Sequence, residues 1–145
     1  MIIVDASIAI KWLNQAEEGS SEALVLYKKH IEKQETILFP QLLLIEVANY
    51  LATKTNTSEK NIKDGLQLLF QSHFAIHQPT EEEVIEASVL AKAYHTTAYD
   101  MLYAIIAKRK QCVLVTADEK FVLKVTFPFV KTLTTYASLE PAQAE

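Results

Sequence analysis

Apolar residues along this chain fall into short continuous runs that alternate with longer stretches of helical spacing. Residues 2–4 are wholly apolar and end at Asp5, which is typical of a short buried strand. Similar runs predict strands over 37–39, 74–76, 112–115 and 129–133. Apolar residues three and four positions apart predict helices over 7–13, 19–34, 41–53, 58–72, 80–94, 100–110 and 119–125. Because strands and helices alternate, we expect an α/β fold in which helices cover both faces of a parallel sheet.

The length and composition of the chain are those of one folded domain. Half of its 145 residues are hydrophobic, which excludes a disordered chain, and two Gly and four Pro are too few for an all-β fold. We expect a single domain over residues 1–145, with a frayed tail over 140–145. The N-terminus lacks a signal-peptide pattern and no apolar run approaches membrane-spanning length, so we expect a cytoplasmic protein without a membrane partner.

Charge, cysteine and histidine content narrow the classes of function. A formal net charge of −4 does not suit a protein held on nucleic acid by a broad basic surface. It is compatible with a nuclease whose clustered carboxylates hold divalent cations. The single Cys112 excludes an internal disulfide, and a role as a small buried hydrophobe is favoured over catalysis. The histidines lack the spacing of a zinc site: His30, His73, His77 and His95.

Four acids are the candidates for chemistry. Asp5 and Asp118 each follow an apolar strand, so both should project from the same edge of a parallel sheet. Glu46 is the only charge in the helix over 41–53, and Asp100 begins another helix that can reach that edge. Four ionised carboxylates cannot share a dry cleft unpaired, because like charges and desolvation raise their pKa values. A hard cation resolves this conflict, since Mg²⁺ and Mn²⁺ prefer oxygen ligands.

Each aspartate also has a purely structural interpretation. Asp5 and Asp118 could cap the helices that follow them, and Asp100 could be a first-turn acid favoured by the helix dipole. Glu46 is harder to explain in this way, because a lone Glu in an apolar helix is rarely buried without a partner. A salt bridge from Glu46 to Lys11 or Arg109 would satisfy it. The conjunction of all four acids favours a functional site.

Other polar residues also have structural or functional interpretations. Asn49 lies three residues after Glu46 on the same helical face, where an interhelical hydrogen bond is favoured over a ligand role. Thr80 begins a capping box whose first-turn acids should be surface charges. Lys11 is a candidate phosphate contact, while the triplet over 108–110 is better explained as cations at a helix C-terminus.

Four motifs in order resemble the PIN domain, and most of all its small VapC-type toxins: VDAS at 4–7, IEVANYL at 45–51, YDMLYAIIA at 99–107 and VTAD at 115–118. The resemblance covers nearly the whole chain in motif order and spacing. It implies a PIN-like three-layer α/β/α fold with a central parallel sheet of four to five short strands and an acidic pocket at one edge. It also implies Mg²⁺- or Mn²⁺-dependent endoribonuclease activity, a homodimer, and a cognate antitoxin that occupies the acidic pocket.

The resemblance also assigns residues. It implies one set of catalytic and metal-binding acids: Asp5, Glu46, Asp100 and Asp118. Ser7 and Thr116 match small hydroxyl positions that support this set, and Asn49 matches the polar position one turn after the glutamate. The chain departs from the family pattern after VTAD, where Glu119 stands in place of a frequent basic residue, and over 110–112, which lack a frequent glycine.

These assignments give a hydrolytic hypothesis. Metal ions held by the acids would lower the pKa of a water and neutralise charge on the scissile phosphate, and in-line attack would leave a 5′-phosphate and a 3′-hydroxyl. The alternatives are a stand-alone PIN nuclease, a catalytically silent PIN binding module, and a phosphatase with Asp5 as its nucleophile. A phosphatase of that kind needs a second Asp where Ser7 stands.

Overall fold

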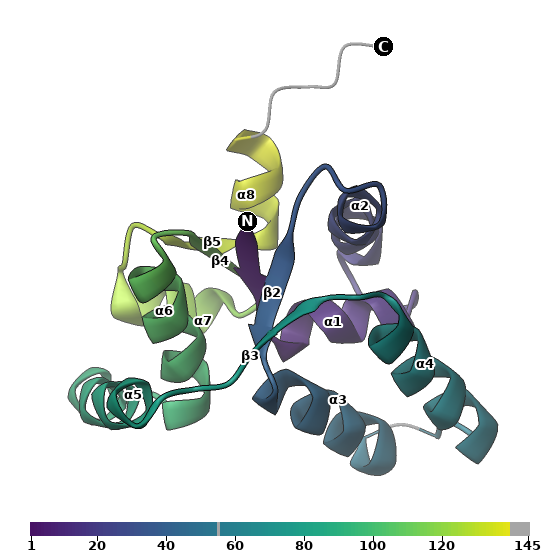
Figure 1. The fold of residues 1–145 in the computed structure, drawn as a ribbon, viewed down its shortest axis with the longest axis horizontal. Coiled ribbons are helices and arrows are strands. Elements are labelled where there is room, and N and C mark those ends of the chain that lie inside the picture. Colours follow the sequence, from purple (N-terminus) through teal and green to yellow (C-terminus); the bar gives the residue numbers. More distant parts are fainter. Residues whose placement is uncertain (55, 140–145) are drawn as a thin grey trace.

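A central sheet lies between two groups of helices in the computed structural model, which describes residues 1–54 and 56–139 (Figure 1). The strands of the described chain are β1 (Ile2–Val4), β2 (Ile37–Pro40), β3 (Ala75–His77), β4 (Val113–Thr116) and β5 (Val130–Thr132). The helices are α1 (Ala6–Leu13), α2 (Ser20–Ile31), α3 (Leu42–Thr53), α4 (Glu59–Gln71), α5 (Glu81–Tyr94), α6 (Ala98–Lys110), α7 (Glu119–Val125) and α8 (Leu133–Leu139). The tail expected over 140–145 lies outside the described residues.

The order of the strands places β1 at the centre of the sheet, with β4 beside it. All neighbours pair in parallel in the order β3-β2-β1-β4-β5, with Ile3 opposite Leu38 on one side and Leu114 on the other. The chain leaves β1 toward β2 and β3, and then returns to β4 on the other side of β1. Helices α1 to α4 cover one face, and α5 to α7 cover the other (Figure 1). The predicted three-layer fold is confirmed, and β1 and β4 meet where ligands bind in such sheets.

Complete burial of the central strands and of one helix explains their apolar sequences. Ile3, Phe39 and Leu114 on the strands, and Ile105 and Ile106 on α6, are at most 1 % exposed. Helix α6 packs directly on β1 and β4, so apolar residues occupy most of its circumference after the first turn. This packing fixes the N-terminal turn of α6 at the carboxyl edge of the sheet. In the described chain, no helix is long and apolar enough to cross a membrane.

An aromatic cluster joins α1 and α2 to the end of α4. The ring of Phe74 stacks on Trp12 with centroids 5.1 Å apart and on His30 with centroids 4.4 Å apart. The backbone N–H of Ile37 donates to Nδ1 of His30, so Nε2 carries the proton and donates to the carbonyl of Ser72 at 3.0 Å. His30 is therefore a structural residue, as its spacing predicts.

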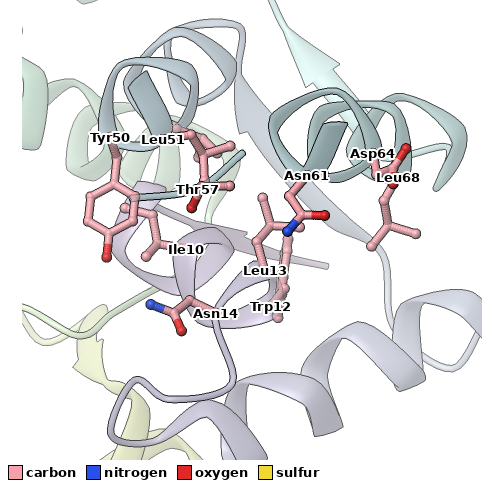
Figure 2. Close-up of a pocket in the computed structure, with 12 residues that line it drawn as sticks. Ile10, Trp12, Leu13, Asn14, Tyr50, Leu51, Thr57, Asn61, Asp64 and Leu68 are labelled. Carbon is pink, nitrogen blue, oxygen red and sulfur yellow. The ribbon is translucent and has the colours of Figure 1, made fainter. Parts of the chain in front are cut away.

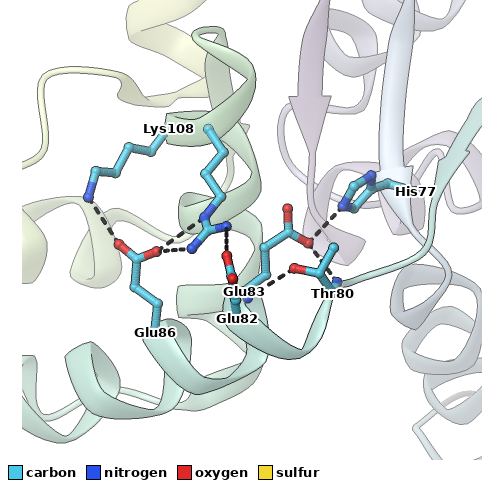
Figure 3. Close-up of polar contacts among 7 residues, drawn as sticks. His77, Thr80, Glu82, Glu83, Glu86 and Lys108 are labelled. Carbon is cyan, nitrogen blue, oxygen red and sulfur yellow. Dashed lines mark hydrogen bonds and ion pairs between the residues drawn. The ribbon is translucent and has the colours of Figure 1, made fainter.

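Polar contacts of α5 and α6 lock these two helices together (Figure 3). The predicted capping box of Thr80 and Glu83 is present, but the expectation that Glu83 is a surface charge is wrong. Glu83 is 4 % exposed and its Oε2 lies 2.8 Å from Nε2 of His77 at the end of β3. At the C-terminal end of α6, Lys108 and Arg109 form ion pairs with Glu86 of α5, with N···O distances of 3.0 and 2.8 Å. These two cations therefore hold α6 against α5.

The structure differs from the sequence-based expectations mainly near the C-terminus. Helix α8 begins at Leu133, inside the strand predicted over 129–133, and Leu133 is its only described buried residue. A helix of two turns with one buried residue has no apolar period that a sequence could reveal. Cys112 precedes β4 and is half-buried rather than a core residue.

Candidate functional site

A cleft of about 290 Å³ opens at the carboxyl edge of the sheet, where α1, α3 and α6 meet. All four candidate acids line it. The full described lining is Asp5, Ala6, Ser7, Ile10, Glu46, Asn49, Tyr50, Lys54, Asp100, Tyr103 and Asp118. We call this space the acidic cleft. Thr116 lies behind it, hydrogen-bonded to Asp5, and Lys11 does not line it.

Asp5 is the best-fixed member of the acidic cleft. Its Oδ1 accepts hydrogen bonds from the hydroxyl of Ser7 at 2.5 Å and from the backbone N–H of Ile8 at 3.4 Å, which caps α1. Its Oδ2 accepts from the hydroxyl of Thr116 at 2.5 Å. Asp5 is thus both a helix cap and a member of the cleft, so the two interpretations of this residue are not exclusive.

Each hydroxyl that binds Asp5 is itself held by the backbone of the β4–α7 connection. Ser7 Oγ accepts from the N–H of Ala117 at 2.9 Å, and Thr116 Oγ1 accepts from the N–H of Asp118 at 3.0 Å. Each hydroxyl is polarised by the backbone N–H from which it accepts, so it stabilises the ionised carboxylate of Asp5. These hydrogen bonds also link the end of β1 to the end of β4. A phosphatase with Asp5 as its nucleophile would need a second acid at position 7, and the Ser7 hydroxyl there donates to Asp5, which argues against the phosphatase interpretation.

Electrostatic coupling in the acidic cleft converges on Asp100. Burial raises the pKa of Asp5 to about 6, against the hydrogen bonds from Ser7 and Thr116, and the charge of Asp100 adds to the rise. Burial likewise raises the pKa of Glu46, with a further contribution from Asp100. The pKa of Asp100 is raised by burial and by the charge of Asp118. The cleft therefore resists carrying its full negative charge.

Helix capping accounts for the positions of Asp100 and Asp118. Thr97 caps α6 by accepting from the N–H of Asp100, so Asp100 is the third residue of the helix rather than its first. Asp118 caps α7, its Oδ1 accepting from the N–H of Phe121 at 3.0 Å. Within the described chain no hydrogen bond uses Oδ2 of Asp118, so this oxygen is available to a ligand in the cleft.

The partner of Glu46 was not found from the sequence. Instead of the salt bridge expected to Lys11 or Arg109, Glu46 Oε1 accepts a hydrogen bond from the hydroxyl of Tyr103 at 2.7 Å. Tyr103 is 1 % exposed and lies one helical turn after Asp100, on the same face of α6. That three-residue spacing is the one sequence signal that could have indicated it.

We expect Tyr103→Phe to raise the pKa of Glu46, because it removes a hydrogen bond that favours the ionised carboxylate. The ring still fills its place, so the free energy of unfolding should fall by only about 1 kcal/mol. Carboxyl ¹³C NMR titration would follow Glu46, with Tyr94→Phe on α5 as the matched control. An unchanged titration of Glu46 in Tyr103→Phe would contradict the contact.

The lysine that lines the acidic cleft in the described chain is Lys54, and not Lys11 as expected from the sequence. The ammonium of Lys11 donates to the backbone carbonyl of Glu18 and lies 3.8 Å from the carboxylate of Glu17, facing a separate depression beside α8. Lys54, the C-cap of α3, lines the acidic cleft and is the one Lys or Arg among the described lining residues. The structure thus puts a different lysine beside the acids.

A second groove continues from the acidic cleft (Figure 2). It has a volume of about 430 Å³, lies between α1, α3 and α4, and shares Ile10 and Tyr50 with the cleft. Its floor contains Trp12 and Leu13, and Asn61 and Asp64 lie on α4 at its rim. No Lys or Arg is among its described lining residues, so it suits neutral or apolar groups better than phosphates.

The residues of the acidic cleft fit a hydrated divalent cation. Every candidate ligand supplies oxygen, the donor atom that Mg²⁺ prefers, and a cation would relieve the repulsion centred on Asp100. In residues 1–54 and 56–139, no three His, Cys, Asp or Glu side chains are grouped closely enough to hold a metal ion. Because Mg²⁺ usually keeps several waters and takes one or two carboxylates directly, an open set of this kind still fits it.

Comparison with known proteins adds a family and several related folds. A family model described as PIN domain matches residues 2–124. PAE2754 from Pyrobaculum aerophilum is 21% identical over 94% of this chain and 93% of its own, with a TM-score of 0.70. The Mycobacterium tuberculosis VapC20 toxin, described as cleaving the sarcin-ricin loop, is 12% identical over 85% and 94%, with a TM-score of 0.65. VapBC2 from Rickettsia felis, bound to a promoter DNA fragment, is 20% identical over 91% and 98%, with a TM-score of 0.65. No curated protein matches this chain.

Proposed function

Because this chain belongs to the PIN domain family, we propose that it is a Mg²⁺- or Mn²⁺-dependent endoribonuclease and the toxin of a VapBC-like pair. Members of this family are generally nucleases that use divalent metals. The observation that carries the proposal is the acidic cleft, in which Asp5, Glu46, Asp100 and Asp118 come together from distant parts of the sequence. Similar folds in a VapC toxin and a VapBC complex support the toxin assignment.

In this proposal each acid has a role that follows from its contacts. Asp5, Asp100 and Asp118 would hold the cation, one or two of them directly and the rest through its waters, with Asp5 fixed by its two hydroxyl donors. Mg²⁺ or Mn²⁺, when bound, lowers the pKa of a water and offsets charge on the phosphate. Tyr103 occupies Oε1 of Glu46, so Oε2 is left to orient a water or to accept its proton. Burial raises the pKa of Glu46, which makes its carboxylate a better proton acceptor than an exposed one.

The proposal extends to protein partners. A toxin of this kind acts in the cytoplasm and is held inactive by a cognate antitoxin over the acidic cleft. It also forms a homodimer, for which the exposed apolar side chains of Ile45 on α3, of Ile85 and Val89 on α5 and of Tyr99 on α6 offer a surface. Each of these four side chains is more than 60 % exposed: Ile45 65%, Ile85 63%, Val89 63% and Tyr99 62%.

Removal of metal tests the proposed activity. We expect the purified chain to cut a pool of structured RNAs in Mg²⁺ or Mn²⁺, to stop in EDTA, and to resume when excess Mg²⁺ is added back. Products should carry a 5′-phosphate and a 3′-hydroxyl, which adaptor ligation detects without prior end repair, and the cut positions reveal the target. A 2′,3′-cyclic phosphate, or cutting that persists in EDTA, would contradict the mechanism. Binding of RNA without cutting in either metal would favour a silent binding module.

A further inference from the structure

Lys54 occupies a distinctive place in the acidic cleft. It is the C-cap of α3, its side chain is exposed, and it is the one Lys or Arg among the described residues that line the cleft. None of the described side chains forms a salt bridge with it. Other cations are engaged elsewhere: Lys11 with the Glu18 carbonyl, and Arg109 with Glu86. Among the described residues, Lys54 therefore lies beside several carboxylates without forming an ion pair with any of them.

The position of Lys54 along α3 decides what it can contact. Glu46, Asn49, Tyr50 and Lys54 recur at helical spacing, so they form one stripe along the same face of α3. Eight residues separate Glu46 from Lys54, which is about 12 Å along the helix axis. An ion pair requires an N···O distance of about 4 Å or less. Because Lys54 forms no ion pair with a described acid of the cleft, its ammonium is available to a phosphate beside the one over the acids.

We propose that Lys54 forms a binding subsite for a phosphate that flanks the scissile bond of the nucleic acid strand, with the Asn49 amide between the two phosphates. This inference rests on the proposed function and extends it, because it gives the strand a direction along α3. The strand runs from the acids past Tyr50 toward the C-terminus of α3. The groove of Figure 2, which has no Lys or Arg among its described lining residues, begins at Tyr50. In this arrangement the sugar-phosphate backbone of the strand passes Lys54, and the groove receives uncharged groups.

The purely structural explanation of Lys54 is that a cation at a helix C-terminus interacts favourably with the helix dipole and so stabilises the helix. Lys110 provides a matched control, because it is also an exposed lysine at the C-terminal end of a helix, α6. Since the N-terminal turn of α6 lies at the carboxyl edge of the sheet, Lys110 lies at the opposite edge, away from the acidic cleft. Lys54→Ala and Lys110→Ala should therefore lower thermal stability alike, whereas only Lys54→Ala should weaken binding of nucleic acid.

The test measures binding of a fluorescent, mixed-sequence single-stranded RNA oligonucleotide at a series of NaCl concentrations. Asp100→Asn protein serves as the background, so that the RNA is not cut. Loss of one phosphate contact should lower the slope of log Kd against log salt by about 0.7 in Lys54→Ala. Lys54→Arg should restore the slope, and Lys110→Ala should leave it unchanged. In cutting assays with Asp100 intact, Lys54→Ala should raise KM several-fold and leave kcat within about two-fold, because the contact is made equally in the ground and transition states.

The outcomes separate this inference from the proposed function. Metal-dependent cutting with the same salt slope in Lys54→Ala and the parent would overturn the Lys54 subsite and leave the nuclease intact. A fall in kcat with no change in KM would place Lys54 at the scissile phosphate itself and would also overturn the subsite. Absence of both RNA binding and RNA cutting in the parent protein would overturn the proposed function and the subsite together.

Discussion

The Asp100→Asn variant should lose metal-dependent RNA cutting and, without metal, should be more stable than the parent protein. Asp100 is the acid whose charge raises the pKa values of both Asp5 and Glu46. Its loss removes a proposed metal ligand, and a fall of about 1,000-fold in cutting rate corresponds to about 4 kcal/mol of lost transition-state stabilisation. Its loss also removes like-charge repulsion, which should raise the free energy of unfolding by about 1 kcal/mol at neutral pH.

The pH dependence of this gain has a definite sign. The pKa of Asp5 is about 6 in the folded protein and 3.8 in its ordinary state, so the folded protein binds this proton more tightly. The contribution of Asp5 to stability is therefore greatest below about pH 4 and is lost as the pH rises through 6 and its carboxyl becomes charged. The gain in Asp100→Asn should be present above pH 6 and should disappear below about pH 4, where the Asp5 carboxyl of the parent is already neutral.

Thermal denaturation in EDTA and cutting assays in Mg²⁺ would measure both effects. Asp64→Asn is the matched control, because it removes the same charge from an exposed residue on α4 that pairs with Lys60 at 2.7 Å. Full cutting by Asp100→Asn would contradict the site assignment. A metal-free Asp100→Asn that is less stable than the parent at pH 7 would mean that its contacts with Thr97 outweigh the repulsion.

The second large effect is expected from Thr116→Val. Valine has nearly the shape of threonine, but it removes the hydroxyl that donates to Oδ2 of Asp5 at 2.5 Å. A hydrogen bond to a charged group contributes about 1.5–3 kcal/mol, and one pKa unit corresponds to about 1.4 kcal/mol. The pKa of Asp5 should therefore rise by about one unit above 6. Because metal and proton compete for the ionised carboxylate, the rise of activity with pH should move to higher pH by about one unit.

The expected readout for Thr116→Val is a cutting rate at pH 6 that is about fivefold below that of the parent, with much of the loss recovered at higher pH or higher metal concentration. Thr116→Ser retains a hydroxyl and should behave like the parent. Thr132→Val is the matched control, since Thr132 pairs with Thr116 in the neighbouring strand β5 but binds Thr135. An equal loss of activity at every pH in Thr116→Val would indicate damage to the fold instead of a shifted pKa.

Much of the fold could be predicted from the sequence, because its signals are local. Apolar runs and helical spacing located every strand and all helices before α8, with ends differing by a few residues. The capping box at Thr80 was equally visible, since both of its partners lie within one turn. The alternation of these elements was enough to predict the parallel sheet, and hence that Asp5 and Asp118 would lie at one edge.

Contacts between distant elements required the tertiary structure. Glu46 and Tyr103 are 57 residues apart, and nothing in either helix indicates that their side chains meet. Arg109 was an equally plausible partner for Glu46 from its charge, but packing of α6 on the sheet turns Arg109 toward α5. Proximity in sequence to Asp5 favoured Lys11, yet the Lys11 ammonium donates to the Glu18 carbonyl and faces the separate depression beside α8.

The sequence by itself therefore determined the elements, their order and the acids that could bind a cation. Hydrophobic periodicity and helix caps depend on residues within one or two turns of each other, so the local sequence is enough to predict them. The family resemblance named Ser7 and Thr116, but only the tertiary structure decided that both donate to Asp5. Only the tertiary structure decided which tyrosine holds Glu46, and that Lys54 is the cation beside the acids. These choices depend on how each helix is rotated and crossed against its neighbours, and that geometry results from the packing of the whole core.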